Sequence, residues 1–201
     1  MYSTLEYRQE SRSGYYRTSA YFLGKLLFDV IPLRAFVAFL YATITYWMIG
    51  FKPDFVSYLI YVGNLVLMTW SSAALFVLFG SCADALDKTL PAFGISVSLM
   101  LMFSGFIINI NSIMSWLAWL KYINIIFYSY NTVVANEISG QVFCNPFPDN
   151  STCAIGDDYL DQQGIDFSTR GLWINQIGMA CITIGCFTLT YIRLRLLCRL
   201  A

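Results

Sequence analysis

The stretch FVSYLIYVGNLVLMTWSSAALFVLFG, residues 55–80, contains no Asp, Glu, Lys or Arg. A helix needs about 20 apolar residues to cross the roughly 30 Å of hydrocarbon in a bilayer, and this stretch is longer than that. Lipid offers no hydrogen-bond partner to the backbone, so the stretch is predicted to be a helix. Its central small residues, Ser71 to Ala74, would let a neighbouring helix approach closely.

Three further apolar runs surround this one. The tight turn GFKPD, residues 50–54, separates it from the run before, and the polar stretch Ser81–Thr89 separates it from the run after. We therefore predict an all-α fold, a polytopic membrane helical bundle with four transmembrane helices at residues 30–50, 55–80, 90–110 and 172–192.

The long connection at residues 111–171 separates the third and fourth predicted spans. Its first half is amphipathic and aromatic and contains Lys121 and Glu137, so it would cross a membrane poorly. We predict short re-entrant or interfacial helices there, packed on the outer end of the bundle. The second half, residues 139–170, is acidic and typical of a structured loop.

Composition favours a membrane protein and argues against several other classes. Of the 201 residues, 58% are hydrophobic and only 12% are charged, whereas soluble domains have about 45–50% and 25%. The net charge of +0 offers no basic footprint for nucleic acid. The chain has no His and no phosphate-binding GxxxxGK[ST] loop, so we expect no catalytic residue, no metal site and no cofactor bound by this chain.

Lys and Arg near the span ends predict the orientation. One side of the membrane would hold eight of them, against three on the other, which are Lys52, Lys121 and Arg170. Both termini are therefore predicted to be cytoplasmic and residues 111–171 extracellular. Cys144 and Cys153 fall in that outer loop, where an oxidising compartment favours a disulfide, and Asn150 begins a glycosylation sequon there. We expect a multi-pass protein of the plasma membrane.

A few residues of the spans have two interpretations each. Asp29 and Arg34 are charges at membrane depth, either part of a substrate path or anchors at the interface. One side of the third span carries Gly94, Val97, Ser98 and Leu101, which could form a helix–helix seam or the wall of a cavity. The outer residues Phe106 and Ile107 could exclude water as a gate or face lipid as a cap.

The string SGYYRTSAYFLGKLLFDVIPLR, residues 13–34, resembles the entry into the third transmembrane helix of G-subfamily ABC half-transporters. Within them it is most similar to the breast cancer resistance protein group of multidrug exporters. The resemblance continues, in order and with few gaps, over essentially the whole chain. It includes YWMIGFKP (46–53), FSGFIINI (103–110), SWLAWLKY (115–122), NEISGQVFC (136–144) and YLDQQGIDFSTRGLW (159–173).

This resemblance implies that the chain is part of an ABC-2 type transmembrane domain, with the four spans as the third to sixth of six helices. Residues 1–29 would form a cytoplasmic coupling region with an amphipathic helix at about 5–20. Family members work as dimers, so a second half-transporter subunit, in a homo- or heterodimer, would be a partner. The resemblance makes the side of Gly94, Val97, Ser98 and Leu101 a cavity wall and Phe106–Ile107 the hydrophobic plug.

This sequence departs from the family pattern at several positions. The plug of the multidrug relatives is a leucine pair, and a hydroxyl residue of the cavity wall is replaced by Gly94. The loop has only Cys144 and Cys153, which fits a bridge within one chain rather than between two. The first two helices and the nucleotide-binding domain of the family are not in this sequence, so ATP and Mg²⁺ would belong to that other domain.

Three hypotheses follow for the function. The first is the membrane part of an ATP-driven exporter of apolar or amphipathic small molecules, such as drugs, sterols or lipids. The second is a truncated, non-transporting paralogue that pairs with a full half-transporter and regulates it. The third is a four-span channel or receptor component. In each case membrane lipid surrounds the helices, and the chain alone is not expected to be an enzyme.

Overall fold

The computed structural model describes residues 23–24, 26–82, 86–107, 115–144 and 153–200. The predicted coupling helix and Asn150 lie outside these residues. The described chain is almost entirely helical, as predicted for an all-α membrane domain. Its elements are η1 (Leu26–Val30), α3 (Ile31–Ile49), α4 (Phe55–Cys82), α5 (Leu86–Met102), η3 (Ser115–Tyr122), α6 (Ile125–Ile138), β1 (Val142–Cys144), β2 (Cys153–Ile155), α7 (Gly156–Gln163) and α8 (Thr169–Leu200).

Three of the described helices are long and apolar enough to cross a membrane: α3, α4 and the part of α8 from Thr169 to Leu196. They coincide with the first, second and fourth predicted spans. The 28 residues of α4 correspond to about 42 Å at 1.5 Å per residue, more than the hydrocarbon thickness. At 17 residues, α5 is shorter than the third span predicted at 90–110.

The chain leaves the helical conformation after Met102 because of Ser104 and Gly105. The Ser104 hydroxyl donates to the Leu101 carbonyl oxygen at 2.8 Å, and the Phe106 N–H then bonds that hydroxyl at 3.3 Å. Gly105 has φ +89°, a left-handed conformation that glycine adopts without steric cost. The helix is therefore Leu86–Met102 rather than a continuous span to residue 110.

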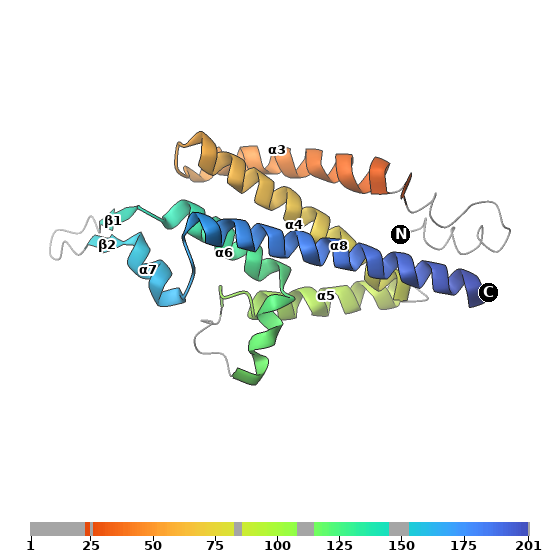
Figure 1. Ribbon diagram of the computed structural model, residues 1–201. Coiled ribbons are helices and arrows are strands. Elements are labelled where there is room, and N and C mark those ends of the chain that lie inside the picture. Colours follow the sequence, from red (N-terminus) through yellow and green to blue (C-terminus); the bar gives the residue numbers. More distant parts are fainter. Residues whose placement is uncertain (1–22, 25, 83–85, 108–114, 145–152, 201) are drawn as a thin grey trace.

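The central helix of the bundle is α4, which packs against α8, α3, α6 and α5 and lies among them in Figure 1. Ser71, Ala73 and Ala74 are buried, as expected for small residues at a helix–helix contact. Buried polar contacts also fasten α4 to α8 and to α6. The Ser71 and Thr183 hydroxyls of α4 and α8 share a hydrogen bond, and the Asn64 amide donates to the Ser129 hydroxyl of α6 at 2.9 Å.

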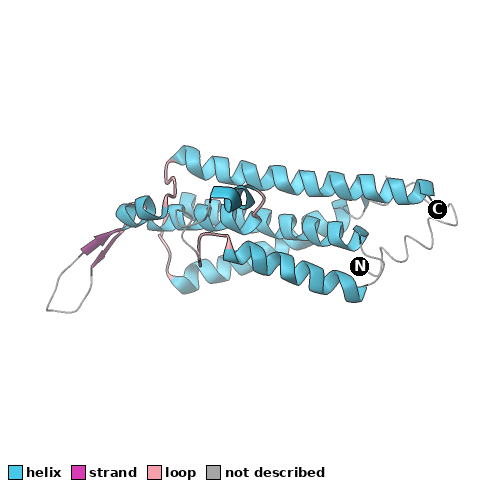
Figure 2. Cartoon of the chain, turned by 90° about the horizontal axis from the view of Figure 1, so that it is seen from below, coloured by secondary structure: helices cyan, strands magenta, loops and turns pink. Residues whose placement is uncertain are grey.

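A small hairpin and α7 project beyond one end of the long helices, opposite to the C-terminal end of α8 (Figures 1 and 2). Strands β1 and β2 pair antiparallel, and α7 follows β2 directly. We call β1, β2 and α7 together the cap. Leu160 of α7 is completely buried and packs with Ala135 of α6 and with Ile165. This apolar contact fixes the cap on α6.

The outer side of α3 shows large apolar side chains to the surroundings. Phe36, Trp47 and Met48 are among the exposed ones. Soluble proteins rarely expose contiguous apolar patches of this kind, whereas lipid solvates them without cost. The surface therefore agrees with a helix placed in a bilayer.

Candidate functional site

The four predicted wall residues of α5 share one open face. Gly94 and Ser98 are exposed, Val97 is half-buried and Leu101 is 42% exposed. The Ser98 hydroxyl donates to the Gly94 carbonyl oxygen at 2.9 Å, so its proton is bonded within the helix. The face is uncharged, and apart from this satisfied hydroxyl it offers a ligand only apolar contacts.

α5 is held to the bundle through a different side. The Phe93 ring packs edge-on against Phe76 and Phe79 of α4, with centroid distances of 5.1 and 6.3 Å. Each helical residue turns the direction of its side chain by about 100°, so Phe93 points away from Gly94 and lies at the edge of the predicted wall, next to the half-buried Val97. Among the described residues, this attachment leaves Gly94, Ser98 and Leu101 of the predicted wall exposed.

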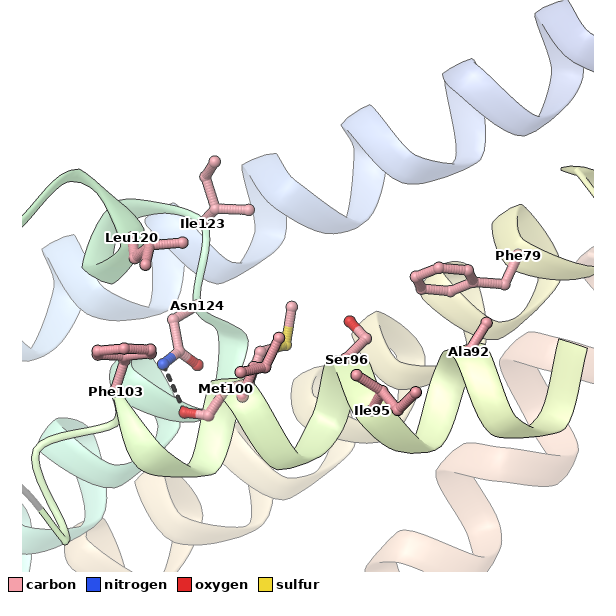
Figure 3. Close-up of a pocket in the computed structure, with 10 residues that line it drawn as sticks. Phe79, Ala92, Ile95, Ser96, Met100, Phe103, Leu120, Ile123 and Asn124 are labelled. Carbon is pink, nitrogen blue, oxygen red and sulfur yellow. Dashed lines mark hydrogen bonds between the residues drawn. The ribbon is translucent and has the colours of Figure 1, made fainter. Parts of the chain in front are cut away.

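A cavity of about 430 Å³ lies along α5 (Figure 3). At about 100° per residue, the α5 residues that line it lie on the opposite side of the helix from the predicted wall. Its lining is apolar except for Ser96 and Asn124. It consists of Ala92, Ile95, Ser96, Leu99, Met100 and Phe103 of α5 together with Phe79, Leu120, Ile123 and Asn124. This cavity was not predicted from the sequence. The spacing of Ile95, Leu99 and Phe103 was the available signal, but the other wall comes from segments distant in sequence.

Asn124 links the C-terminal end of α5 to the start of α6. Its side-chain oxygen accepts the N–H groups of Ile126 and Phe127 at 3.0 and 3.2 Å, an N-cap that satisfies free helix donors. Its amide nitrogen donates to the Met100 carbonyl oxygen at 2.6 Å (Figure 3). Asn124 is only 2% exposed. This one buried side chain therefore satisfies backbone groups at the end of α5 and at the start of α6.

The predicted gate residues, Phe106 and Ile107, come a few residues after the end of α5. Phe106 is 71% exposed and Ile107 is 61% exposed. The Phe106 ring packs edge-on against Tyr130 of α6, with centroids 5.8 Å apart and planes at 72°. The two apolar side chains are therefore presented just beyond the C-terminal end of α5, with one ring supported by α6.

The turn between α3 and α4 is bound to the C-terminal end of α6. The Lys52 ammonium donates to the carbonyl oxygens of Asn136, at 3.1 Å, and Ser139. The Lys52 N–H donates to one Glu137 carboxylate oxygen at 3.2 Å, and the Asn136 amide to the other at 2.7 Å. Because Lys52 and Glu137 are far apart in sequence, no local pattern indicated the pair.

Glu137 is 8% exposed, and α6 is not one of the three candidate spans. Burial raises the pKa of its carboxyl above the ordinary value of 4.5. The hydrogen bonds from Lys52 and Asn136 and the Lys52 charge oppose that rise, while Asp54 adds to it. Desolvation is the largest effect, so the cluster favours the neutral acid more than water does.

The two loop cysteines are at opposed backbone positions in the hairpin register. Cys144 of β1 is the direct partner of Cys153 of β2. Directly opposed residues of an antiparallel pair have Cα atoms about 4.5–5.5 Å apart, which lies within the range that a disulfide spans. The register supports the predicted pairing.

The other predicted residues are placed as follows. Asp29 belongs to the π-helical turn η1, and Arg34 is exposed in the first turn of α3. Among the described residues, no three His, Cys, Asp or Glu side chains gather as metal ligands would.

A family model described as ABC-2 type transporter matches residues 6–138 of the chain. The chain is also similar to a pig (Sus scrofa) protein named "Broad substrate specificity ATP-binding cassette transporter ABCG2". The two are 35% identical over 191 residues, which cover 92% of this chain and 29% of the pig protein.

Two further relatives come from mouse and from an amoeba. The Mus musculus protein "ATP-binding cassette sub-family G member 3" is 30% identical over 200 residues, covering 94% of this chain and 30% of that protein. The Dictyostelium discoideum protein "ABC transporter G family member 24" is 30% identical over 199 residues, covering 95% and 16%. The chain thus spans less than a third of the length of these relatives.

Proposed function

The chain belongs to the ABC-2 type transporter family, as the transmembrane part of a G-subfamily ABC transporter, and from this we propose that it forms the membrane path of an ATP-driven exporter. The substrates would be apolar or amphipathic small molecules, moved by alternating access. The chain would work with a second half-transporter subunit and a nucleotide-binding domain. It has no phosphate-binding loop, so ATP and Mg²⁺ would bind to that domain.

The open face of α5 carries this proposal. Gly94, Val97, Ser98 and Leu101 offer shape and apolar contact without an ionised group, which suits an apolar ligand that must also leave again. In a dimer, this face would meet the partner subunit across the substrate cavity. The similarity to a transporter named for broad substrate specificity supports such a site.

Phe106 and Ile107 would form the gate at the outer end of this path. Their exposed apolar side chains would meet those of the partner subunit and close the passage by excluding water. The register of Cys144 and Cys153 supports a disulfide in the cap. The cap would lie on the extracellular side, with both termini in the cytoplasm and the protein in the plasma membrane.

Transport in inside-out membrane vesicles tests this function. The vesicles would contain the chain assembled with its nucleotide-binding domain, and ATP-dependent uptake of a fluorescent amphipathic dye would be followed. Leu101→Ala removes apolar contact from the wall and should raise the apparent KM for the dye, by roughly tenfold. Phe106→Ala opens the gate and should increase dye leak in the absence of ATP.

Leu33→Ala and Phe36→Ala are the matched controls, because both side chains are exposed on α3, away from the proposed path. Each should transport like the unchanged protein. Unaltered KM in Leu101→Ala together with unaltered leak in Phe106→Ala would contradict the proposed path.

A further inference from the structure

The cavity along α5 is a groove that opens to the surroundings of the chain. Ile95 and Leu99 of α5, and Ile123 from the opposite wall, are each more than half exposed. None of the residues that line the groove is charged, and only Ser96 and Asn124 are polar. In a bilayer, a groove of this composition suits a hydrocarbon group better than water.

The length of the groove is that of one lipid leaflet. Its α5 wall extends from Ala92 to Phe103, which is about 16 Å at 1.5 Å per residue, and the hydrocarbon of a whole bilayer is about 30 Å thick. α5 runs in the same general direction as the membrane-spanning part of α8 (Figure 1). A hydrocarbon chain laid in the groove would therefore run parallel to the acyl chains of the surrounding lipid.

The opposite wall comes from η3 and the residues that follow it, at the C-terminal end of α5. Leu120 and Ile123 lie across from Phe103 (Figure 3), and the Ile123 N–H donates to the Leu120 carbonyl oxygen at 3.2 Å. The buried Asn124 amide fixes this wall to α5 through the Met100 carbonyl oxygen, at 2.6 Å. Hydrogen bonds therefore hold the groove in shape at this end.

The same segment carries side chains that proteins place at the level of lipid headgroups. Trp119 and Tyr122 are exposed, and η3 runs across the direction of α5 (green in Figure 1), as interfacial helices do. The Lys121 ammonium lies 5.2 Å from the centroid of the Tyr122 ring. In the described part of the chain, no carboxylate pairs with this ammonium. A positive charge is therefore available beside the groove.

We propose that the groove binds one phospholipid, with an acyl chain along α5 and the phosphate at Lys121. The apolar lining recognises the chain, and the Lys121 charge, next to Leu120 of the lining in the sequence, complements the phosphate. At about 100° per residue, the groove and the face of Gly94 and Leu101 are on opposite sides of α5. The lipid would support α5 from behind, and the proposal does not depend on the substrate path.

Photo-crosslinking of the chain assembled with its nucleotide-binding domain tests the site. The probe is a phosphatidylcholine with a diazirine on one acyl chain, added to the protein in detergent and activated by light. Mass spectrometry should locate the cross-link at Met100 or Phe103. Leu99→Trp fills the groove and should reduce this cross-link roughly tenfold, the equivalent of losing contact with about two CH₂ groups.

Leu40→Trp is the matched control for the change in size. Leu40 of α3 is 45% exposed and Leu99 is 52% exposed, so each tryptophan is added at a similarly exposed leucine. Leu40→Trp should leave the cross-link at Met100 and Phe103 unchanged. Circular dichroism should show the same helical content in both variants.

Competition with unlabelled lipids tests the phosphate contact. Diacylglycerol has the same chains without the phosphate, and it should displace the probe roughly tenfold less well than phosphatidylcholine, as expected for a hydrogen bond to a charged group. Lys121→Gln should abolish this difference, and Lys121→Arg should keep it. Ser96→Ala should leave the labelling unchanged, because a hydrocarbon chain makes no hydrogen bond to the hydroxyl.

Equal labelling of Met100 and Phe103 in Leu99→Trp and the unchanged protein would overturn the site, as would the absence of labelling in the groove. A further helix of the transporter seated in the groove would give the second result, because it would exclude the probe. Equal displacement by the two competitors would overturn the phosphate contact. A loss of labelling in Ser96→Ala would indicate a ligand with a polar group deep in the groove and would overturn the acyl chain. None of these measurements uses transport, so they are independent of the proposed exporter function.

Discussion

Single side chains join segments that lie far apart in this sequence. Lys52 brings a positive charge to carbonyl oxygens at the C-terminal end of α6, where the helix dipole favours cations. Glu137 receives the Lys52 backbone N–H nearby. The α3–α4 turn is therefore held to α6 by one half-buried lysine and one buried glutamate.

The first prediction concerns the pH dependence given by Glu137. Its pKa is raised in the folded chain, so between 4.5 and that raised value the folded state binds more protons than the unfolded state. The free energy of unfolding then falls as pH rises through this window and is recovered on acidification toward 4.5. Glu137→Gln cannot titrate and should lose this contribution.

The pH dependence of the free energy of unfolding can be measured between about pH 4.5 and 7. Circular dichroism would monitor the unfolding of the chain in detergent. Asp158→Asn, at an exposed acid of α7, is the control. Its free energy of unfolding should change with pH by the same slope as that of the unchanged chain. Equal slopes for Glu137→Gln and the unchanged chain would contradict the prediction.

At the scale of elements, the start of α8 depends on a close approach to the preceding turn. A Cβ atom on Gly171 would meet the Asp166 carbonyl oxygen and lie 2.8 Å from its Cγ. The same turn is closed by the Ser168 hydroxyl, which accepts the Gly171 N–H at 3.1 Å. Only a residue without a side chain leaves this turn intact.

The second prediction compares two glycines of α8. Gly171→Ala forces the Asp166 turn apart and should lower the free energy of unfolding by about 1–3 kcal/mol. Gly185→Ala, where nothing lies within 4 Å, should be neutral or stabilise by about 0.5–1 kcal/mol through helix propensity. Thermal unfolding in detergent measures both, and equal effects of the two changes would refute the role of the close approach.

At the scale of the whole molecule, α4 organises the bundle while α3 and α5 keep open apolar sides. The open side of α3 agrees with lipid, and that of α5 is the one we assign to the substrate path. The cap lies at the end opposite to the C-terminal end of α8 (Figure 1), so an orientation with that end in the cytoplasm puts the cap outside.

The third prediction tests this orientation in a host with a secretory pathway. With the cap outside, Asn150 should carry a glycan, seen as an endoglycosidase-sensitive mobility shift that Asn150→Gln abolishes. The peptides of Cys144 and Cys153 should be joined without reductant and separate with it, and Cys181→Ser in α8 should leave them joined. Absence of both the glycan and the joined peptides would contradict the orientation.

Much of the bundle could be predicted because lipid solvation acts on local composition. The apolar runs at 30–50, 55–80 and 172–192 became α3, α4 and the span of α8, with end shifts of a few residues. The third run ended early because Ser104 and Gly105 turn the backbone after Met102, an effect that a hydropathy window does not contain. The cysteines opposed in the hairpin were also expected from their shared loop.

The sequence by itself determined that this is the helical membrane part of a G-subfamily ABC transporter, and which side of α5 carries the small and apolar residues. The tertiary structure decided the contacts on which the site depends: the cavity along α5, the Lys52–Glu137 cluster and the packing of Phe106 against Tyr130. Hydrophobicity and spacing are properties of neighbouring residues, so they can be read along the chain. Contacts between distant residues depend on which helix faces meet, and only packing around α4 settles that.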